Sequence, residues 1–244
     1  MSKIKPYSMW TGGFVYGFFF QKGLYNVITI DQYIEDWFKD RPIKRHITIG
    51  VTNLLNGAFE VFSEHQKTSD MIELLKASVA FSGMSPAVPL FNGLYLTGNS
   101  IYENDVNTAI LHCEELGYDE KDIVIDSIIS GSILMDFWDA SKQNAFGAMI
   151  QSSKLWKYYD KVHGILRAKI THQDATFRYI IGPESPMPTK LSPSQYDTKT
   201  TKQMLYDGEQ NTKNTIARLV RNPQSELERQ LYSSRSIYYY NPVR

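Results

Sequence analysis

Ile123-Val124-Ile125-Asp126-Ser127-Ile128-Ile129 is a nearly all-apolar run, which is typical of a parallel strand covered by helices on both faces. Upstream, residues 94–96 predict a short strand, and Asp105 can cap a helix that ends near Gly117. The face of that helix expected to be buried holds Val106, Ala109, Ile110 and Cys113. Strand, helix and strand over this length predict one right-handed βαβ unit, and therefore an α/β fold.

The residues before this unit predict a helix and a strand pair. Apolar residues recur at the spacing of one buried face over residues 30–39, and Thr29 is in position to cap that helix. Residues 46–52 and 58–62 have strand patterns, and Asn56-Gly57 between them is a strong turn signal. We therefore expect an antiparallel hairpin in the first quarter of the chain.

A capping box predicts the next helix. Asp70 and Glu73 stand three residues apart, so each side chain can satisfy a free backbone amide at a helix start. The helix is expected to end at Ser82-Gly83. Its expected buried residues are Met71, Leu74, Leu75 and Val79.

Three elements are predicted after the apolar run. Residues 135–168 predict a helix, residues 176–181 a strand, and residues 198–220 a mostly polar helix. The apolar residues of the first of these helices that are available for burial are Phe137, Phe146, Ile150, Leu155, Trp156 and Tyr159. One domain is expected over residues 1–220, followed by a poorly ordered tail at 221–244.

Composition excludes several classes of protein. The 244 residues carry 26 basic and 26 acidic side chains, so the chain has no field that would steer it onto nucleic acid. Its 42% hydrophobic content is that of a folded globular protein. Cys113 is the single cysteine, which rules out an internal disulfide. No run approaches the ~20 apolar residues of a membrane span, so a cytoplasmic chain is expected, although an N-terminal targeting signal could be missing.

Metal and cofactor sites are not expected from the sequence. The five histidines show no paired spacing with carboxylates or cysteine of the kind that a zinc site uses. We expect solvated or core side chains at His46, His65, His112, His163 and His172. Gly12 to Gly17 is no phosphate loop, because no Lys-Ser/Thr pair follows it.

Residues 75–88, Leu-Lys-Ala-Ser-Val-Ala-Phe-Ser-Gly-Met-Ser-Pro-Ala-Val, and 93–99, Gly-Leu-Tyr-Leu-Thr-Gly-Asn, resemble the second catalytic segment of patatin-like phospholipases. In that family a small-residue helix end and a Pro-containing turn lead into a strand that ends in Asp-Gly-Gly or Asp-Gly-Ala. Residues 22–26, Lys-Gly-Leu-Tyr-Asn, are similar to its Gly-Leu-Phe/Tyr-Asp turn. Residues 47–53, with Asn56-Gly57 and Val61-Phe62, are similar to its strand pair.

Two further segments fit the same family. Residues 123–126, and residues 177–180 with the Pro-rich loop after them, fit strands and a loop seen in some members. The match covers most of residues 23–208. The resemblance implies a three-layer α/β/α domain with a mostly parallel sheet, and lipid acyl hydrolysis by a Ser-Asp dyad. It also implies a lipid or membrane surface as partner, with peripheral membrane association.

The residues that such catalysis needs are not present in this chain. The family uses a serine in Gly-x-Ser-x-Gly and an upstream glycine-rich oxyanion loop, and neither motif occurs in the sequence. The position of the aspartate holds Thr97, followed by Gly98 and Asn99. A threonine hydroxyl holds no negative charge at neutral pH and cannot accept the serine proton.

Other residues are weak substitutes for the dyad. Asp105 is expected to cap a helix, and Ser85 to lie in a structural turn. Ser100 follows a strand but lacks the second glycine, and Ser8 has no glycine elbow. Ser132, and with it Ser130, follows the apolar run 123–129, although no flanking glycine completes the motif.

The sequence therefore indicates a patatin-like lipid acyl hydrolase homologue that is inactive as written and lacks the N-terminal catalytic part of the domain. Two origins stay open, a truncated gene model and a pseudoenzyme that acts at a lipid surface or on a protein partner. A third interpretation is an unrelated hydrolase that uses Ser130 or Ser132.

Overall fold

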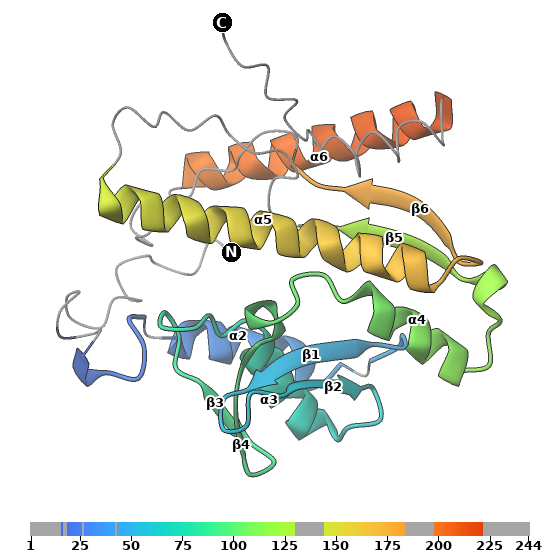
Figure 1. Ribbon diagram of the computed structural model, residues 1–244. Coiled ribbons are helices and arrows are strands. Elements are labelled where there is room, and N and C mark those ends of the chain that lie inside the picture. Colours follow the sequence, from blue (N-terminus) through green and yellow to red (C-terminus); the bar gives the residue numbers. More distant parts are fainter. Residues whose placement is uncertain are drawn as a thin grey trace, which may run out of the picture. The chain divides into compact units, whose positions relative to one another are not determined.

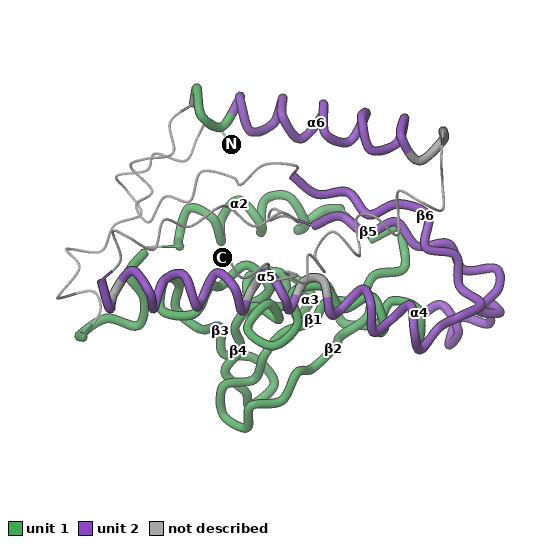
Figure 2. The backbone as a smooth tube through the Cα atoms, turned by 45° about the horizontal axis from the view of Figure 1, so that its top comes forward, with its two compact units in different colours: residues 1–112, 189–201 green, residues 113–188, 202–244 purple. Residues whose placement is uncertain are grey.

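The computed structural model describes residues 16, 19–25, 27–41, 43–129, 144–183 and 198–221 (Figure 1). The chain divides into two compact units, one of residues 1–112 and 189–201, the other of residues 113–188 and 202–244 (Figure 2). Ser8, Ser130, Ser132, the predicted start of a helix at 135 and residues 222–244 of the predicted tail lie outside the described residues. The expected single domain over residues 1–220 stays a prediction.

The first unit contains a four-stranded antiparallel sheet. Its strand order is β2-β1-β4-β3. The strands are β1 (Thr48–Asn53), β2 (Phe59–Ser63), β3 (Val88–Leu90) and β4 (Gly93–Thr97). The predicted hairpin is confirmed, with Thr48 paired to Ser63 and Thr52 to Phe59. Gly57 adopts a positive φ of 74° at the turn, where a residue without Cβ is least strained.

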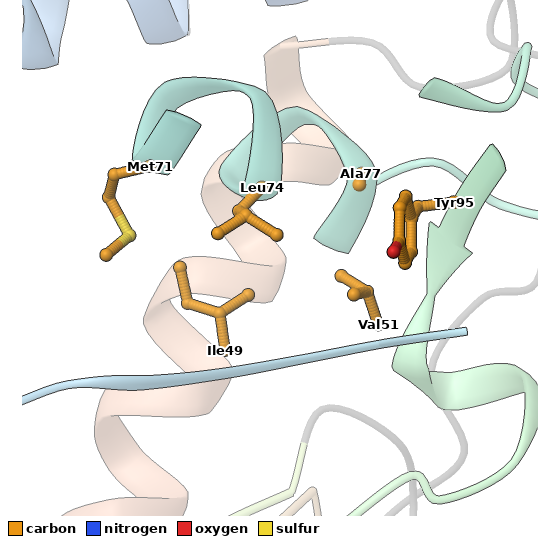
Figure 3. Close-up of a cluster of buried hydrophobic side chains, with 6 residues drawn as sticks. All are labelled: Ile49, Val51, Met71, Leu74, Ala77 and Tyr95. Carbon is orange, nitrogen blue, oxygen red and sulfur yellow. The ribbon is translucent and has the colours of Figure 1, made fainter. Parts of the chain in front are cut away.

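The helices α2 (Ile28–Phe38), α3 (Thr68–Ser78) and most of α4 (Val106–Glu115) belong to the described part of this unit. Helix α3 packs on β1, β3 and β4, and α2 packs on α3. The core lies between β1 and α3, where Ile49 and Val51 point from the strand toward the helix (Figure 3). The buried cluster consists of Ile49, Val51, Met71, Leu74, Ala77 and Tyr95.

Two predicted helix starts are wrong. Helix α2 begins at Ile28, with Val27 at the N-cap and no side-chain cap, so Thr29 lies inside the first turn. Helix α3 begins at Thr68, so Asp70 stands in its first turn, where the positive end of the helix dipole favours a carboxylate. The Asp70–Glu73 capping box does not form, because Glu73 accepts a hydrogen bond from Lys76 instead.

Burial on α3 and α4 follows the prediction only in part. Met71, Leu74, Val106 and Ile110 are buried as expected, whereas Leu75 is half-buried. Val79 is exposed because it follows the last residue of α3, outside its packed face. Ala109 is exposed and Cys113 half-buried. The packed face of α4 is thus narrower than its apolar pattern indicates.

The second unit contains a parallel pair of strands, β5 (Val124–Ile128) and β6 (Thr176–Ile181). Between them the chain forms α5 (Ala145–Thr171), which Asn144 caps by accepting a 2.8 Å hydrogen bond from the Gly147 amide. Arg178 binds Asp126 with two hydrogen bonds across the pair, one of them 2.8 Å from Nε to Oδ1. The helix α6 (Thr198–Arg221) follows, as predicted.

The mixed α/β class is confirmed, but the predicted βαβ unit is wrong. Strand β4 is hydrogen-bonded to β1 on one edge and to β3 on the other, both antiparallel, so it has no edge left for β5. The parallel partner of β5 is β6. Full coverage of both faces of β5 is also wrong, since Val124 and Ile128 are exposed.

Helix α5 buries a different face from the predicted one. Among the side chains of α5 that the structure describes, the buried ones are Tyr158, Ile165 and Ala168, whose spacings of seven and three place them on one side of the helix. The side chains of Phe137 and Phe146, which the sequence also predicts to be buried, are outside the described part. Ile150, Leu155, Trp156 and Tyr159 are exposed. Within the described part of the chain, none of the helices combines the length and apolarity that crossing a membrane requires.

Leu74→Ala should lower the free energy of unfolding by about 2–5 kcal/mol, because it removes a fully buried side chain from the β1–α3 core. Chemical denaturation followed by circular dichroism measures this. Leu55→Ala is the matched control, since Leu55 is 68% exposed in the β1–β2 turn. Equal losses for the two variants would contradict the assigned core.

Candidate functional site

The segment Thr97–Asn99 lies where β4 ends in a short 3₁₀ turn, η2 (Gly98–Ser100). Thr97 is buried, and its backbone amide donates a 3.0 Å hydrogen bond to the Ala80 carbonyl beyond the end of α3. Its Oγ1 accepts a 3.3 Å hydrogen bond from the Asn99 amide. The side chain that replaces the expected aspartate therefore caps the turn.

A pocket of about 310 Å³ opens beside this turn. We call it the Thr97 pocket. Its lining is mostly polar, with hydroxyl, carboxamide and carboxylate side chains from β1, α3, β4, η2, α4 and the segment before α4. The polar residues that line it are Thr48, Ser78, Thr97, Asn99, Glu103, Asp105 and Thr108. A pocket of this kind suits a small ligand with several hydrogen-bonding groups.

The carboxylate of Asp105 is engaged at the start of α4. Its Oδ1 accepts a 3.2 Å hydrogen bond from the Thr108 amide, as in a helix cap. Asp105 lines the Thr97 pocket, so the fold brings these two predicted residues to the same site. The hydrogen bond from the Thr108 amide nevertheless gives the Asp105 carboxylate a structural role as a helix cap.

Ser78 is a hydroxyl in this pocket that sequence reasoning missed. It is the last residue of α3, and its Oγ donates a 2.8 Å hydrogen bond to the Leu75 carbonyl. A carbonyl oxygen is not a general base, so this contact does not activate the hydroxyl for attack. No glycine elbow marks Ser78 in the sequence, and its place in the pocket follows from the packing of α3 on β4.

Close backbone approaches bring four of the patatin-like segments together. A Cβ at position 98 would lie 2.5 Å from the Gly50 carbonyl oxygen, so only glycine fits between β1 and the 97–99 turn. A Cβ at position 23 would lie 2.7 Å from the backbone of Ser85 and Pro86. The adjacent Tyr25 amide also donates a 2.8 Å hydrogen bond to the Met84 carbonyl.

A second pocket, of about 240 Å³, lies between α2, α3 and β3. We call it the α2–α3 pocket. Lys76 at its wall is buried, and its Nζ donates 2.6 Å hydrogen bonds to Glu35 and Glu73. Burial alone would lower the pKa of Lys76, but the two carboxylates outweigh it and raise the pKa. Burial also raises the pKa of Asp31 in the same wall, and Lys76 opposes that shift only partly.

His46 is exposed and His112 is buried, as the sequence predicts, but the sequence did not predict that both contact the same carboxylate. Both contact Glu64: His46 through Nδ1 on Oε1, and His112 through Nε2 at 3.1 Å from Oε2. The hydrogen bond with His46, reinforced by the Ile47 amide, lowers the pKa of Glu64 to about 2. Sequence separations of 18 and 48 residues gave no signal for this cluster.

A second group of potential metal ligands lies in the other unit. It consists of Glu114, Glu120 and His172. His172 Nδ1 lies 3.6 Å from Glu120 Oε2, and Glu120 Oε1 accepts a 3.0 Å hydrogen bond from the Asp174 amide. Part of this carboxylate is thereby used to hold the turn before β6.

No protein-family model matches the sequence, and the search of curated proteins finds no match either. The patatin resemblance rests on the quoted segments alone.

Gly98→Ala should destabilise the first unit, because the added Cβ meets backbone that cannot move without disturbing β1. We expect a loss of at least about 1 kcal/mol in the free energy of unfolding. Gly208→Ala in α6 is the control, since a Cβ there has no atom within 4 Å and alanine favours a helix by up to about 1 kcal/mol. Unchanged stability of Gly98→Ala would contradict the close approach.

Asp31→Asn should raise stability at pH 7. Because the folded-state pKa of Asp31 is raised, its ionised form opposes folding above that pKa, and asparagine removes the charge. The gain should vanish as the pH falls below 3.8, the ordinary pKa of aspartate, where the carboxyl is protonated in both states. Thermal melting of both proteins from pH 3 to pH 8 measures it, with the exposed Asp36→Asn as control. A stability gain of Asp31→Asn that grows toward acid pH would contradict a raised pKa of Asp31 in the folded protein.

Proposed function

We propose that this chain is a patatin-like lipid acyl hydrolase homologue that does not hydrolyse esters, and that it binds lipid in its first unit. The observation that carries the proposal is the contact between segments that resemble one family. Gly98 lies against Gly50, Thr97 is bonded to Ala80, and Gly23 lies against Ser85 and Pro86. Segments up to 63 residues apart in sequence, as Gly23 and Pro86 are, thus lie against one another, and two of these contacts are made by the turn at the position of the expected catalytic aspartate.

The chemistry of the Thr97 pocket supports inactivity. Acyl transfer by a dyad needs a hydroxyl nucleophile next to a group that accepts its proton. Thr97 is neutral, Asp105 accepts the Thr108 amide, and Ser78 donates to a backbone carbonyl. The three side chains are thus engaged in holding the fold.

The α2–α3 pocket supports lipid binding. Apart from its ionic wall, it is lined mainly by apolar residues of α2 and of the segment 79–89. The Thr97 pocket is mostly polar, and the hydrogen bond between Thr97 and Ala80 joins a residue of each pocket. An amphipathic lipid has both kinds of group, so we assign its acyl chain to the α2–α3 pocket and its polar head to the Thr97 pocket.

The outer face of α2 supports contact with a membrane surface. Tyr33 and Trp37, four residues apart, are exposed on one face of this helix with their ring centroids 6.0 Å apart, and Arg41 lies over the Trp37 ring at 4.4 Å. Four exposed basic side chains lie at or just beyond its end, namely Lys39, Arg41, Lys44 and Arg45. Apolar and cationic groups in this order suit the interface of an anionic membrane, where each basic residue contributes about 1 kcal/mol. The three-layer arrangement implied by the resemblance stays a prediction.

A fluorophosphonate probe should leave the purified chain unlabelled, because Ser78 of the Thr97 pocket donates to a backbone carbonyl and is not activated to attack phosphorus. Thr97→Asp should also stay unlabelled and should not hydrolyse p-nitrophenyl esters. A known serine hydrolase in the same reaction shows that the probe is competent. Labelling of Ser130 or Ser132, located by mass spectrometry, would contradict the proposal in favour of an unrelated hydrolase.

The chain should sediment with vesicles of phosphatidylcholine and phosphatidylserine, and a double change of Tyr33 and Trp37 to serine should reduce the bound fraction several-fold. Leu55→Ser removes an even more exposed apolar side chain from the β1–β2 turn and should bind as the unaltered protein does. Absence of vesicle binding by the unaltered chain, or an equal loss for Leu55→Ser, would refute the lipid-surface role.

A further inference from the structure

Three potential metal ligands converge from three separate places in the first unit. His46 lies just before β1, Glu64 directly follows β2, and His112 lies in α4. One ligand atom from each of these side chains lies within 4.8 Å of the other two. The hairpin and the helix are thus joined through one carboxylate.

The distances within this cluster are close to those of a metal site. Around a tetrahedral zinc ion with bonds near 2.0–2.1 Å, neighbouring donor atoms lie about 3.3 Å apart. His112 Nε2 already lies 3.1 Å from Glu64 Oε2, and the third donor is within the 4.8 Å limit. Small side-chain shifts are enough to seat an ion between the three atoms.

The surroundings hold Glu64 in place as a ligand. Its Oε2 accepts a 3.0 Å hydrogen bond from the Ile47 amide, next to the ligand His46. Such a backbone contact orients a metal-binding carboxylate before the ion arrives. The Glu64 and His112 side chains are mostly buried, whereas that of His46 is 62% exposed, so the site has a rigid inner side and an open outer side.

The donor set indicates which ion would bind. Two imidazoles and one carboxylate suit zinc better than calcium or magnesium, which take oxygen ligands. Three protein ligands leave the fourth tetrahedral position to a water molecule, as in catalytic zinc sites of the His₂Glu type. We propose that His46, Glu64 and His112 form a solvent-open Zn²⁺ site in the first unit. This proposal does not rest on the proposed lipid-binding function.

Isothermal titration of the tag-free full chain with zinc chloride tests the site. We expect one Zn²⁺ per chain at this cluster. The affinity for zinc should fall more than about tenfold in each of His46→Ala, His112→Ala and Glu64→Gln, because even a residue that only supports a metal ligand contributes about 10–100-fold to affinity. His65→Ala is the matched control, because His65 is exposed beside Glu64 and outside the cluster. It should bind zinc with unchanged affinity.

Cobalt substitution adds a second measurement. Co²⁺ should give the intense visible absorption of a four-coordinate ion in the unaltered chain and lose it in His46→Ala. That variant is the decisive one, because an exposed side chain can be removed without disturbing the core, and circular dichroism checks its fold. Failure of the unaltered chain to bind zinc would overturn the proposal. So would binding that survives His46→Ala but is lost in His172→Ala, since His172 belongs to the other cluster.

Discussion

Strand β1 is hydrogen-bonded along both edges, to β2 and to β4, and the rest of the first unit is arranged around it. On one face, its apolar side chains pack against α3 and form the core. At its middle, the Gly50 carbonyl oxygen is approached closely by Gly98 of the 97–99 turn, which has no Cβ to prevent it. A side chain at position 98 would push that turn away from β1 and open the Thr97 pocket. Both the core and the candidate site thus depend on how closely the chain can approach this one strand.

The polar groups of the candidate site hold the fold, and the proposal of an inactive hydrolase homologue depends on this. Beside the turn and its pocket, the side chains of Ser78, Thr97 and Asp105 all serve as structural hydrogen-bond partners. Threonine in place of aspartate is well suited to this arrangement, because its hydroxyl can accept the Asn99 amide without bringing a charge into a buried position. Thr97 therefore leaves the buried end of β4 uncharged.

The His46–Glu64–His112 cluster has a different physical character from the Thr97 pocket. Its carboxylate is ionised over the whole physiological range, and two imidazoles face it. The three groups are brought together by the β1–β2 pairing and by the position of α4. The cluster therefore ties the two ends of the hairpin to a helix that follows almost fifty residues later in the sequence.

The sequence by itself determined the local elements: the hairpin at Asn56-Gly57, the strands at 94–96 and 176–181, the last helix and the glycine-marked turns. These follow from side-chain periodicity and backbone freedom, which act over a few residues. Only the tertiary structure decided that β4 pairs with β1 and β3 while β5 pairs with β6, because an apolar run fits any sheet that offers an open edge. It likewise decided the meeting of His46, Glu64 and His112, and the place of Ser78 in the pocket. Such contacts join residues far apart in the chain, and no short-range pattern records them.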